Sequence, residues 1–345
     1  MGTLTIKDIA KICKVSTSTV SRAINDDPGI NQKTKERILR VVEEFHFVPN
    51  NSARNLKLAE SNTIALICKG IGNSFFQSMY PMFESELERH GYTFILNEIG
   101  ADKDDAEAAV AIAKEKRLKG VIFLGGLLDN PKVKLRQLAI PYVLTTVAVN
   151  TDAAEVGSSI VAIDDEKESF KIVDYLCKQG HKKIAIVSGR KSDFAVGELR
   201  LEGYKRALEE NGIEVDQRLI RYMPEEIPDY TIQSGYEVTK KLLADQEEFT
   251  ALFATSDLAA FGAYKAISEA GKKIPEDYSV VGFDGLDLTK YMVPSLTTVA
   301  QPTEEFAKAS VDLLMKAING DTTRERLVYD AQIIERDSVK RIGGN

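Results

Sequence analysis

The sequence has few of the features on which membrane, secreted and disulfide-bonded proteins depend. Among its 345 residues, no apolar run approaches the roughly 18 residues of a membrane span, and the opening MGTLTIKDIAKICK has no apolar signal-peptide core. We therefore expect a cytoplasmic protein without a membrane span. The three cysteines, Cys13, Cys68 and Cys177, are far apart and lack the paired spacing of metal or redox centres, which predicts buried free thiols.

Catalytic motifs are missing as well. The three histidines, His46, His90 and His181, do not have metal-ligand spacing, and neither a serine nucleophile elbow nor a phosphate-loop pattern is present. The segment GIGNSF at residues 70–75 begins like a dinucleotide-binding fingerprint but lacks the third glycine. We therefore expect a protein that is not an enzyme and that needs no metal or cofactor.

The charged residues are unevenly distributed. Residues 1–58 contain ten Lys and Arg residues against six Asp and Glu residues, whereas the rest of the chain contains 35 against 46. An acidic chain thus has a basic N-terminal part, and attraction to a phosphate backbone depends on local charge. A solvated helical surface shows the same bias, so charge alone leaves nucleic-acid binding open. The length and an ordinary hydrophobic fraction of 43% predict two or three folded units.

The first 48 residues have the pattern of a small three-helix domain. Thr5 and Asp8 form a capping-box pattern that opens a helix through about Cys13. After a brief turn, Ser16 is the expected N-cap of a second helix through about Asn25, and two short helices across a tight turn make a helix-turn-helix. A third helix over about 31–46 completes the core. The expected core residues are Ile6, Ile9, Ala10, Cys13, Val20, Ile24, Ile38, Val42 and Phe45.

Three segments resemble the lactose and galactose repressor family. They are TIKDIAKICKVSTSTVSRAIN, INQKTKERILRVVEEFHFVPN and NSARNL, and they keep the family core Val-Ser-x-x-Thr-Val-Ser-Arg at residues 15–22. The resemblance extends over essentially the whole chain. It implies a transcription regulator, specifically a repressor, that binds operator DNA and a small effector. Lys14 departs from the family, which usually has Gly in this turn, and a positive φ there would cost Lys about 1 kcal/mol.

The resemblance also implies how the N-terminal domain binds DNA. Residues near the start of a recognition helix face base edges, so Thr17, Ser18 and Arg22 are the expected base readers, with Arg22 bonding bidentately to guanine. Helix capping is the alternative role for Ser18. Asn25, Thr34 and the amides that open the third helix are placed for phosphates. The full expected DNA-binding set is Thr5, Ser16, Thr17, Ser18, Ser21, Arg22, Asn25, Asn31, Thr34, Asn50, Ala53 and Leu56.

A hinge is expected at residues 49–61. Pro49 ends the third helix, because the residue before a proline is disfavoured in the helical region. Residues 50–58 could form one short helix, which would be too short to be stable alone. The resemblance implies that this helix folds on DNA and places Ala53 and Leu56 in the operator minor groove, with Leu56 as an apolar wedge. A plain linker is the alternative.

From residue 62 onward, short apolar runs alternate with amphipathic helices, and the same rhythm restarts near residue 161. We expect the α/β fold class: an N-terminal three-helix helix-turn-helix domain and hinge helix, then a two-lobed body of doubly wound parallel sheets. This body resembles the periplasmic-binding-protein type. The expected division is 1–48 for the DNA-binding domain, 49–61 for the hinge helix and linker, 62–163 with 297–325 for the first lobe, and 164–296 with 326–345 for the second.

Polar residues at the carboxyl ends of the body's strands are candidates for effector binding, because ligands of open α/β sheets bind there. Asp257 follows the expected strand 252–254, Asp284 follows the strand 280–283, and Arg200 lies early in a helix. Two carboxylates and one guanidinium suit the oxygens of a sugar. Helix capping is the alternative for Asp257, and a surface ion pair for Asp284 and Arg200. With the positions that the resemblance adds, the expected set is Asn73, Phe75, Thr146, Phe194, Arg200, Tyr222, Ser256, Asp257, Asp284 and Gln301.

The effector itself cannot be transferred from the family. Ser256 stands where many members have Asn, and Thr146 stands where an acid is frequent. Phe75, Phe194 and Tyr222 could supply an apolar wall for a sugar ring, or could be ordinary core residues. We expect a carbohydrate effector bound between the two lobes. A purine-type co-repressor is the alternative.

The expected assembly is a homodimer, because a two-fold dimer matches a pseudo-palindromic operator. The last residues, RIGGN, lack the leucine heptads that make some members of the family tetrameric. A transport binding protein would share the fold of the body, but it would need an export signal where this chain has a helix-turn-helix. The expected partners are therefore operator DNA, a small effector and a second copy of the chain, with no membrane.

Overall fold

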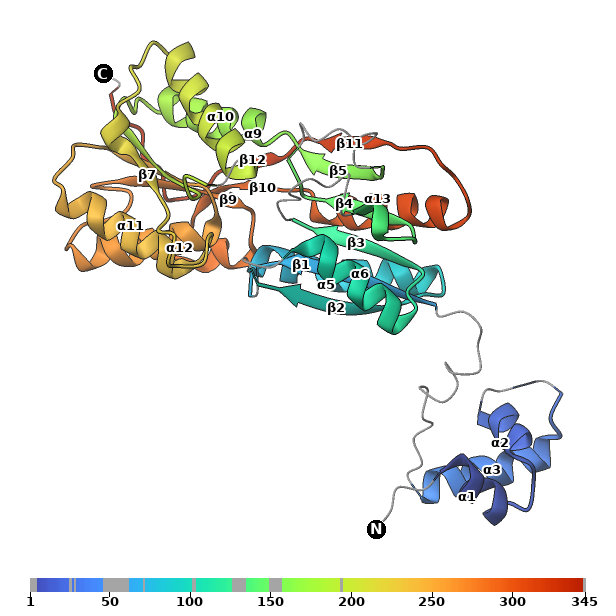
Figure 1. Cartoon of the computed structure of the whole chain (residues 1–345). Coiled ribbons are helices and arrows are strands. Elements are labelled where there is room, and N and C mark those ends of the chain that lie inside the picture. The colour runs from blue at the N-terminus through green and yellow to red at the C-terminus, as the bar shows by residue number, and fades with distance from the viewer. Residues whose placement is uncertain are drawn as a thin grey trace. The chain divides into compact units, whose positions relative to one another are not determined.

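The computed structural model describes residues 5–24, 27, 29–45, 62–70, 72–100, 104–125, 135–148, 157–192 and 195–343, and Figure 1 labels its helices and strands. The chain divides into two compact units, Met1–Ser61 and Asn62–Asn345. We call them the head and the body and describe each by itself. Within the described ranges, no helix combines the length and the apolar character that crossing a membrane requires.

The head contains helices α1 (Ile6–Ile12), α2 (Thr17–Ile24) and α3 (Gln32–Glu44). The expected capping-box residues meet at the start of α1, where the Thr5 amide donates to an Asp8 carboxylate oxygen at 2.9 Å. This bond satisfies one of the backbone amides that a helix start leaves without an intrahelical acceptor. The three expected helices of the head are therefore confirmed.

The turn between α1 and α2 contains Lys14 at φ 49°, in the left-handed region that favours glycine. Next to this turn is a small apolar core, against which the expected Ile6, Ile24 and Val42 pack from its edge. Phe45 was expected in the core, but it is the C-cap of α3 and is 43% exposed, so that expectation is wrong. The buried core residues are Ile9, Ala10, Cys13, Val20, Ala23 and Ile38.

The first lobe of the body is a six-stranded parallel sheet with helices on both faces (Figure 1). Its elements are β1 (Thr63–Lys69), α5 (Ser74–Arg89), β2 (Thr93–Ile99), α6 (Asp105–Lys116), β3 (Gly120–Leu124), η1 (Leu135–Gln137), β4 (Tyr142–Thr145), β5 (Ser159–Ile163), α13 (Thr303–Ile318) and β11 (Arg326–Tyr329). The strand order is β11-β5-β4-β3-β1-β2. Apolar residues of α5 and α13 share one buried cluster and those of α6 and η1 another, which places these helix pairs on opposite faces.

The second lobe repeats this architecture. Its elements are α9 (Asp165–Lys178), β6 (Ile184–Ser188), α10 (Val196–Glu210), η2 (Gln217–Leu219), β7 (Ile220–Tyr222), α11 (Ile232–Ala244), β8 (Ala251–Ala254), α12 (Asp257–Glu269), β9 (Ser279–Asp284), η3 (Asp287–Tyr291), β10 (Thr297–Ala300) and β12 (Gln332–Ile334). The strand order is β12-β10-β9-β8-β6-β7, in which β12 is antiparallel to β10. The expected fold class, a helix-turn-helix head and a two-lobed parallel-sheet body, is confirmed.

The chain crosses between the lobes after β5, after β10 and after β11. Strand pairing moves two segments from the lobes in which the sequence placed them. Residues 297–300 form β10, which pairs with β9 in the second lobe rather than joining the first. Residues 326–329 form β11, which pairs with β5 in the first lobe rather than joining the second. These corrections arise because sheet membership depends on the pairing partner, which is distant in sequence.

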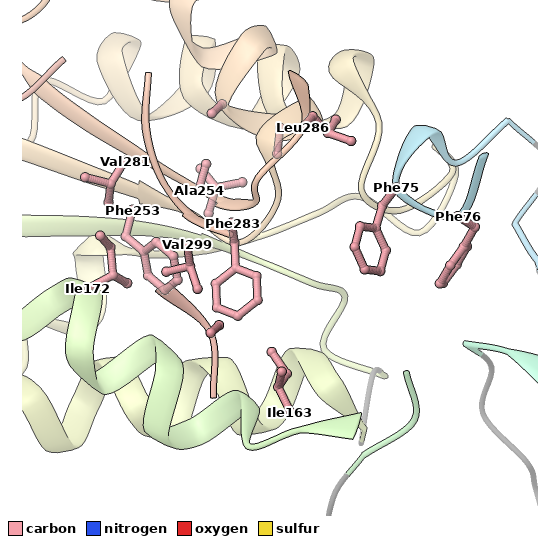
Figure 2. Close-up of a cluster of buried hydrophobic side chains, with 14 of the residues drawn as sticks. Phe75, Phe76, Ile163, Ile172, Phe253, Ala254, Val281, Phe283, Leu286 and Val299 are labelled. Atoms are coloured by element: carbon pink, nitrogen blue, oxygen red, sulfur yellow. The ribbon is translucent and has the colours of Figure 1, made fainter. Parts of the chain in front are cut away.

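The central strands are buried on both faces, which explains their uninterrupted apolar sequences. Every residue of β3, β5, β6 and β8 is buried. Phe253 and Phe283, from neighbouring strands, have ring centroids 6.5 Å apart and belong to one cluster with Ile163, Ile172 and Val299 (Figure 2). This packing fixes the strand ends from which the polar residues of the body project.

Helix α9 holds the segment that crosses between the lobes after β11. The Lys171 ammonium donates to the Ala331 carbonyl at 2.9 Å and forms an ion pair with Glu168, whose side chain is fully buried. Lys167 reaches the Asp330 carboxylate of the same segment at 2.6 Å. Burial raises the pKa of Glu168, although the bond from Lys171 acts in the opposite direction. The crossing is therefore attached to the start of the second lobe.

Candidate DNA-binding and effector sites

The start of α2 is an exposed group of hydroxyls. Ser16 caps this helix, because its Oγ accepts from the Thr19 amide at 3.1 Å. The Ser16 Oγ also lies 2.7 Å from the Ser18 Oγ. Thr17 and Ser18 are both exposed, as residues that contact bases must be. Ser16 is therefore the N-cap of α2, as expected, and the Ser18 hydroxyl bonds to this capping hydroxyl.

Arg22 is the long cationic side chain of α2, and it is 63% exposed. Ser21, beside it, is partly buried. At the other helix starts, Thr5 precedes α1 and the Asn31 side chain accepts from the Lys33 amide at 3.1 Å. Thr34 lies in the first turn of α3 and is partly buried. The remaining expected DNA contacts, Asn25, Asn50, Ala53 and Leu56, lie outside the described residues.

In the second lobe, Asp257 is completely buried where β8 leads into α12. It does not cap its own helix, since Ser256 does so by accepting from the Ala259 amide at 3.1 Å. The Asp257 carboxylate accepts instead from the Thr298 hydroxyl at 2.6 Å and from the Leu286 amide at 2.7 Å. Burial and the negative charge of Asp284 raise the pKa of Asp257 well above its usual range. Asp257 thus ties the start of α12 to β10 and to the turn after β9.

Asp284 ends β9 with φ at 127°, a value that an L-residue rarely adopts. Its carboxylate accepts from the Gln301 side-chain amide at 3.0 Å, and its carbonyl accepts from the Gln301 backbone amide at 3.2 Å. Burial raises the pKa of Asp284 to about 7, although the Arg200 guanidinium and the Gln301 amide act in the opposite direction. The structure therefore brings together Asp284, Gln301 and Arg200, as the sequence predicts.

Arg200 lies in the first turns of α10 and is only 6% exposed, so the alternative of a surface ion pair is wrong for this residue. Its Nε donates to the Asp165 carboxylate at 2.8 Å, and its Nη1 donates to the Thr255 carbonyl at 2.6 Å. The guanidinium carbon also lies 3.9 Å from the centroid of the Phe283 ring. Arg200 is therefore held by α9, the end of β8 and β9 together.

The expected residues of the first lobe lie at the carboxyl ends of β1 and β4. Asn73 caps α5 by accepting from the Phe75 amide at 3.0 Å. Phe75 is buried and packs against Phe76, with ring centroids 5.4 Å apart (Figure 2). Thr146 has φ at 59°, and its hydroxyl accepts from the Gly125 amide at 3.0 Å. These contacts give Asn73 and Thr146 local structural roles at the same edge of the sheet.

Of the three aromatic residues considered for an apolar wall, Phe75 belongs to the buried core. Tyr222, at the end of β7, is partly exposed, and the Lys191 ammonium lies 5.4 Å from the centroid of its ring. Phe194 lies outside the described residues. Tyr222 thus retains an accessible ring at the carboxyl end of the second sheet.

Comparison with known proteins decides the family. Residues 5–50 match the lacI family of bacterial regulatory proteins, and residues 173–339 match the periplasmic binding protein-like domain. The HTH-type transcriptional regulator MalR of Clostridium butyricum is 39% identical over 341 residues, a match that covers 98% of this chain and 100% of that protein. The chain belongs to the lacI family. The HTH-type transcriptional repressor CytR of Escherichia coli, at 32% identity over 98% of the chain, is a further lacI-family relative.

Solved structures agree with the lacI-family assignment. The transcriptional regulator CelR in complex with cellobiose has a TM-score of 0.70 and 29% identity, covering 97% of this chain and 99% of that chain. The Lac repressor dimer bound to operator and the anti-inducer ONPF shares the fold, with a TM-score of 0.77 at 24% identity and coverage of 98% and 100%. As a lacI-family member, the chain is a DNA-binding transcriptional regulator, and its relatives are regulators rather than enzymes.

Two partners of this lacI-family site were missed in the sequence. Asp165, which accepts a bond from Arg200, is the second residue after the end of β5. The same strand-end rule that indicated Asp257 and Asp284 could therefore have found it. Thr298, which bonds Asp257, lies inside β10 and had no such signal. Its role depends on the pairing of β10 with β9, which the sequence did not reveal.

Proposed function

We propose that this lacI-family chain is a repressor whose operator affinity is controlled by a carbohydrate that binds between the two lobes. The observation that carries the proposal is the buried polar cluster of Arg200, Asp165, Asp284 and Gln301 at the carboxyl ends of the second lobe's strands. Carboxylate and amide oxygens accept from sugar hydroxyls, and the guanidinium donates to hydroxyl or ring oxygens. In this proposal Asp284, Gln301 and Arg200 contact the effector directly.

The other expected residues take supporting roles. Asp257 holds the turn that follows Asp284, Ser256 caps α12, and Asn73 and Thr146 supply polar groups from the first lobe. Tyr222, with Phe194 as a further candidate, stacks on the apolar face of the sugar ring. Phe75 is buried in the core, which is the alternative role considered for it.

The ligands in two solved structures of similar regulators support a carbohydrate as the effector. The CelR structure contains cellobiose, and a lacI-family regulator from Enterococcus faecium, 28% identical with a TM-score of 0.70 over 81% of this chain, contains ribose. The repressor PurR of Vibrio atlanticus is 33% identical over 98% of the chain, which keeps the purine-type co-repressor as the alternative. Both classes of ligand belong in the same binding test.

A thermal-shift panel of neutral mono- and disaccharides, sugar phosphates and purines tests the effector. A ligand at 100 times its dissociation constant adds about 2.7 kcal/mol to the unfolding free energy, which raises the melting temperature measurably. We expect a neutral sugar to stabilise the protein, and we expect Asp284→Asn, which keeps the shape of the side chain, to lose that shift. Stabilisation by a purine alone would contradict the carbohydrate assignment and favour the alternative.

We also propose that α2 enters the major groove, with Thr17, Ser18 and Arg22 facing bases. Thr5, Asn31 and Thr34, at or near the starts of α1 and α3, then lie close to phosphates. The hinge at residues 49–61, with Ala53 and Leu56 in the minor groove, remains a prediction. Operator selection with Arg22→Ala tests the base contact, because this variant should lose sequence preference while keeping much of its salt-sensitive binding.

A homodimer completes the proposal. Leu288, Tyr291 and Val293, near the end of β9, are 53%, 68% and 92% exposed, and large apolar side chains that cluster on a surface often mark an interface. A two-fold dimer would bury this surface against its own copy and present two heads to a palindromic site. Sedimentation equilibrium at micromolar concentration should give the mass of two chains. A mass of one or four chains would contradict the dimer.

A further inference from the structure

The side chain of Arg22 has an acidic neighbour beyond the end of its helix. Helix α2 ends at Ile24, and the Asp27 Oδ2 lies 3.5 Å from the Arg22 Nε. The two side chains are 63% and 37% exposed, so the contact lies on the surface of the head. In the proposed function, Arg22 is the residue that reads guanine. A carboxylate in this position therefore affects how the Arg22 side chain contacts the base.

Asp27 is fixed by contacts that do not involve the guanidinium. Its Oδ1 accepts from the Gly29 amide at 2.7 Å, and its carbonyl accepts from the Ile30 amide at 3.2 Å. Its own amide donates to the Arg22 carbonyl at 3.0 Å. Asp27 is thus held by its backbone on both sides and by one carboxylate oxygen, so it forms a fixed point against which the longer Arg22 side chain can be oriented.

The atoms in this contact decide its consequence. A guanidinium has five N–H groups in a rigid plane, and a bidentate contact with guanine uses two parallel bonds to O6 and N7. The contact with Asp27 uses Nε, which leaves the edge formed by Nη1 and Nη2 for the base. Arg carries large rotamer entropy when it is unconstrained, so a side chain oriented beforehand loses less freedom on binding.

We infer that Asp27 is a specificity-determining residue, because it positions Arg22 for guanine. This inference rests on the proposed role of α2 in operator reading. Its negative charge also opposes attraction of the head to any phosphate backbone, which supplies most non-specific binding. Asp27 therefore increases the contrast between operator and random DNA in two ways. It strengthens one base contact, and it weakens contacts that carry no sequence information.

The test is selection of binding sites by the full-length protein from a randomised duplex library, followed by sequencing. Asp27→Asn keeps an oxygen that can accept from the Gly29 amide but removes the charge that faces Arg22. Wild type should enrich a palindromic motif with one strongly preferred guanine in each half-site. In Asp27→Asn that single preference should fall about two- to five-fold, the size expected for an exposed ion pair, while the other positions stay unchanged.

Glu36→Gln is the matched control. Glu36 is exposed on α3, where it accepts from the Gln32 side chain at 3.1 Å, and its substitution removes the same charge from the same domain. Both variants should bind a fixed non-operator duplex more tightly than wild type, and only Asp27→Asn should lose the guanine preference. If Asp27→Asn and Glu36→Gln select the same motif with the same preferences, the inference is overturned. If wild type selects no motif, the proposed function itself fails.

Discussion

Breaking the ion pair between Arg200 and Asp165 from one side should strongly destabilise the body. The two side chains are 8% and 4% exposed, and they join α10 to the first turn of α9. Replacing Arg200 with Ala leaves the buried Asp165 and Asp284 carboxyls without this guanidinium. Breaking a buried pair from one side costs about 3–5 kcal/mol, because the other charge stays out of water. Against a typical total stability of about 5–15 kcal/mol, such a loss is severe.

The destabilisation caused by Asp165→Ala should be smaller than that caused by Arg200→Ala. Arg200 would keep its bond to the Thr255 carbonyl, its contact with the Phe283 ring and the nearby charge of Asp284. The double variant removes both charges at once, so its cost should fall below the sum of the two single costs by about 1–3 kcal/mol. The order of destabilisation is therefore Arg200→Ala above Asp165→Ala, with a coupling that only the double variant exposes.

Urea unfolding followed by far-ultraviolet circular dichroism measures these costs, since the chain has no tryptophan for fluorescence. Glu166→Ala is the control, because Glu166 pairs with Arg206 across the same two helices but is 35% exposed. Its cost should stay below about 1 kcal/mol. If the costs of Arg200→Ala and Asp165→Ala sum to the cost of the double variant within about 0.5 kcal/mol, the two residues are not coupled and the reasoning is refuted.

Three further predictions concern the head, the body and the effector site. Lys14→Gly should raise the melting temperature of the head by about 4–8 °C in a thermal scan, because it relieves about 1 kcal/mol of backbone strain at φ 49°. An unchanged melting temperature would show that the turn is not strained. Burial lowers the pKa of His181, so the unfolded chain binds this proton first as the pH falls. In urea titrations, wild type should therefore lose stability relative to His181→Asn as the pH falls below about 6.5, and a difference that does not change with pH would contradict this assignment. For the sugar found by thermal shift, calorimetry should show an affinity roughly tenfold lower at pH 6 than at pH 8. The reason is that Asp284, with a pKa of about 7, accepts bonds from hydroxyls best when it is ionised. An affinity that does not depend on pH would exclude Asp284 as an acceptor.

The sequence by itself determined the features that depend on local pattern. The capping box of Thr5 and Asp8 and the short helices of the head follow from residues three or four positions apart. The buried strands follow from uninterrupted apolar runs. The strand-end positions of Asp257 and Asp284 follow from those runs, because parallel strands place their carboxyl ends at one edge.

Tertiary structure alone decided which distant residues meet. Whether residues 297–300 and 326–329 join one lobe or the other depends on pairing with strands far away in the sequence. In the same way, the partner of Arg200 lies 35 residues earlier, at Asp165, and the partner of Asp257 lies 41 residues later, at Thr298. Burial of these charges, and hence the raised pKa of Asp284, comes from packing around all of them together. Local pattern places residues at strand ends, but it does not fix which strands pair or which side chains bond, because both depend on segments far apart in the sequence.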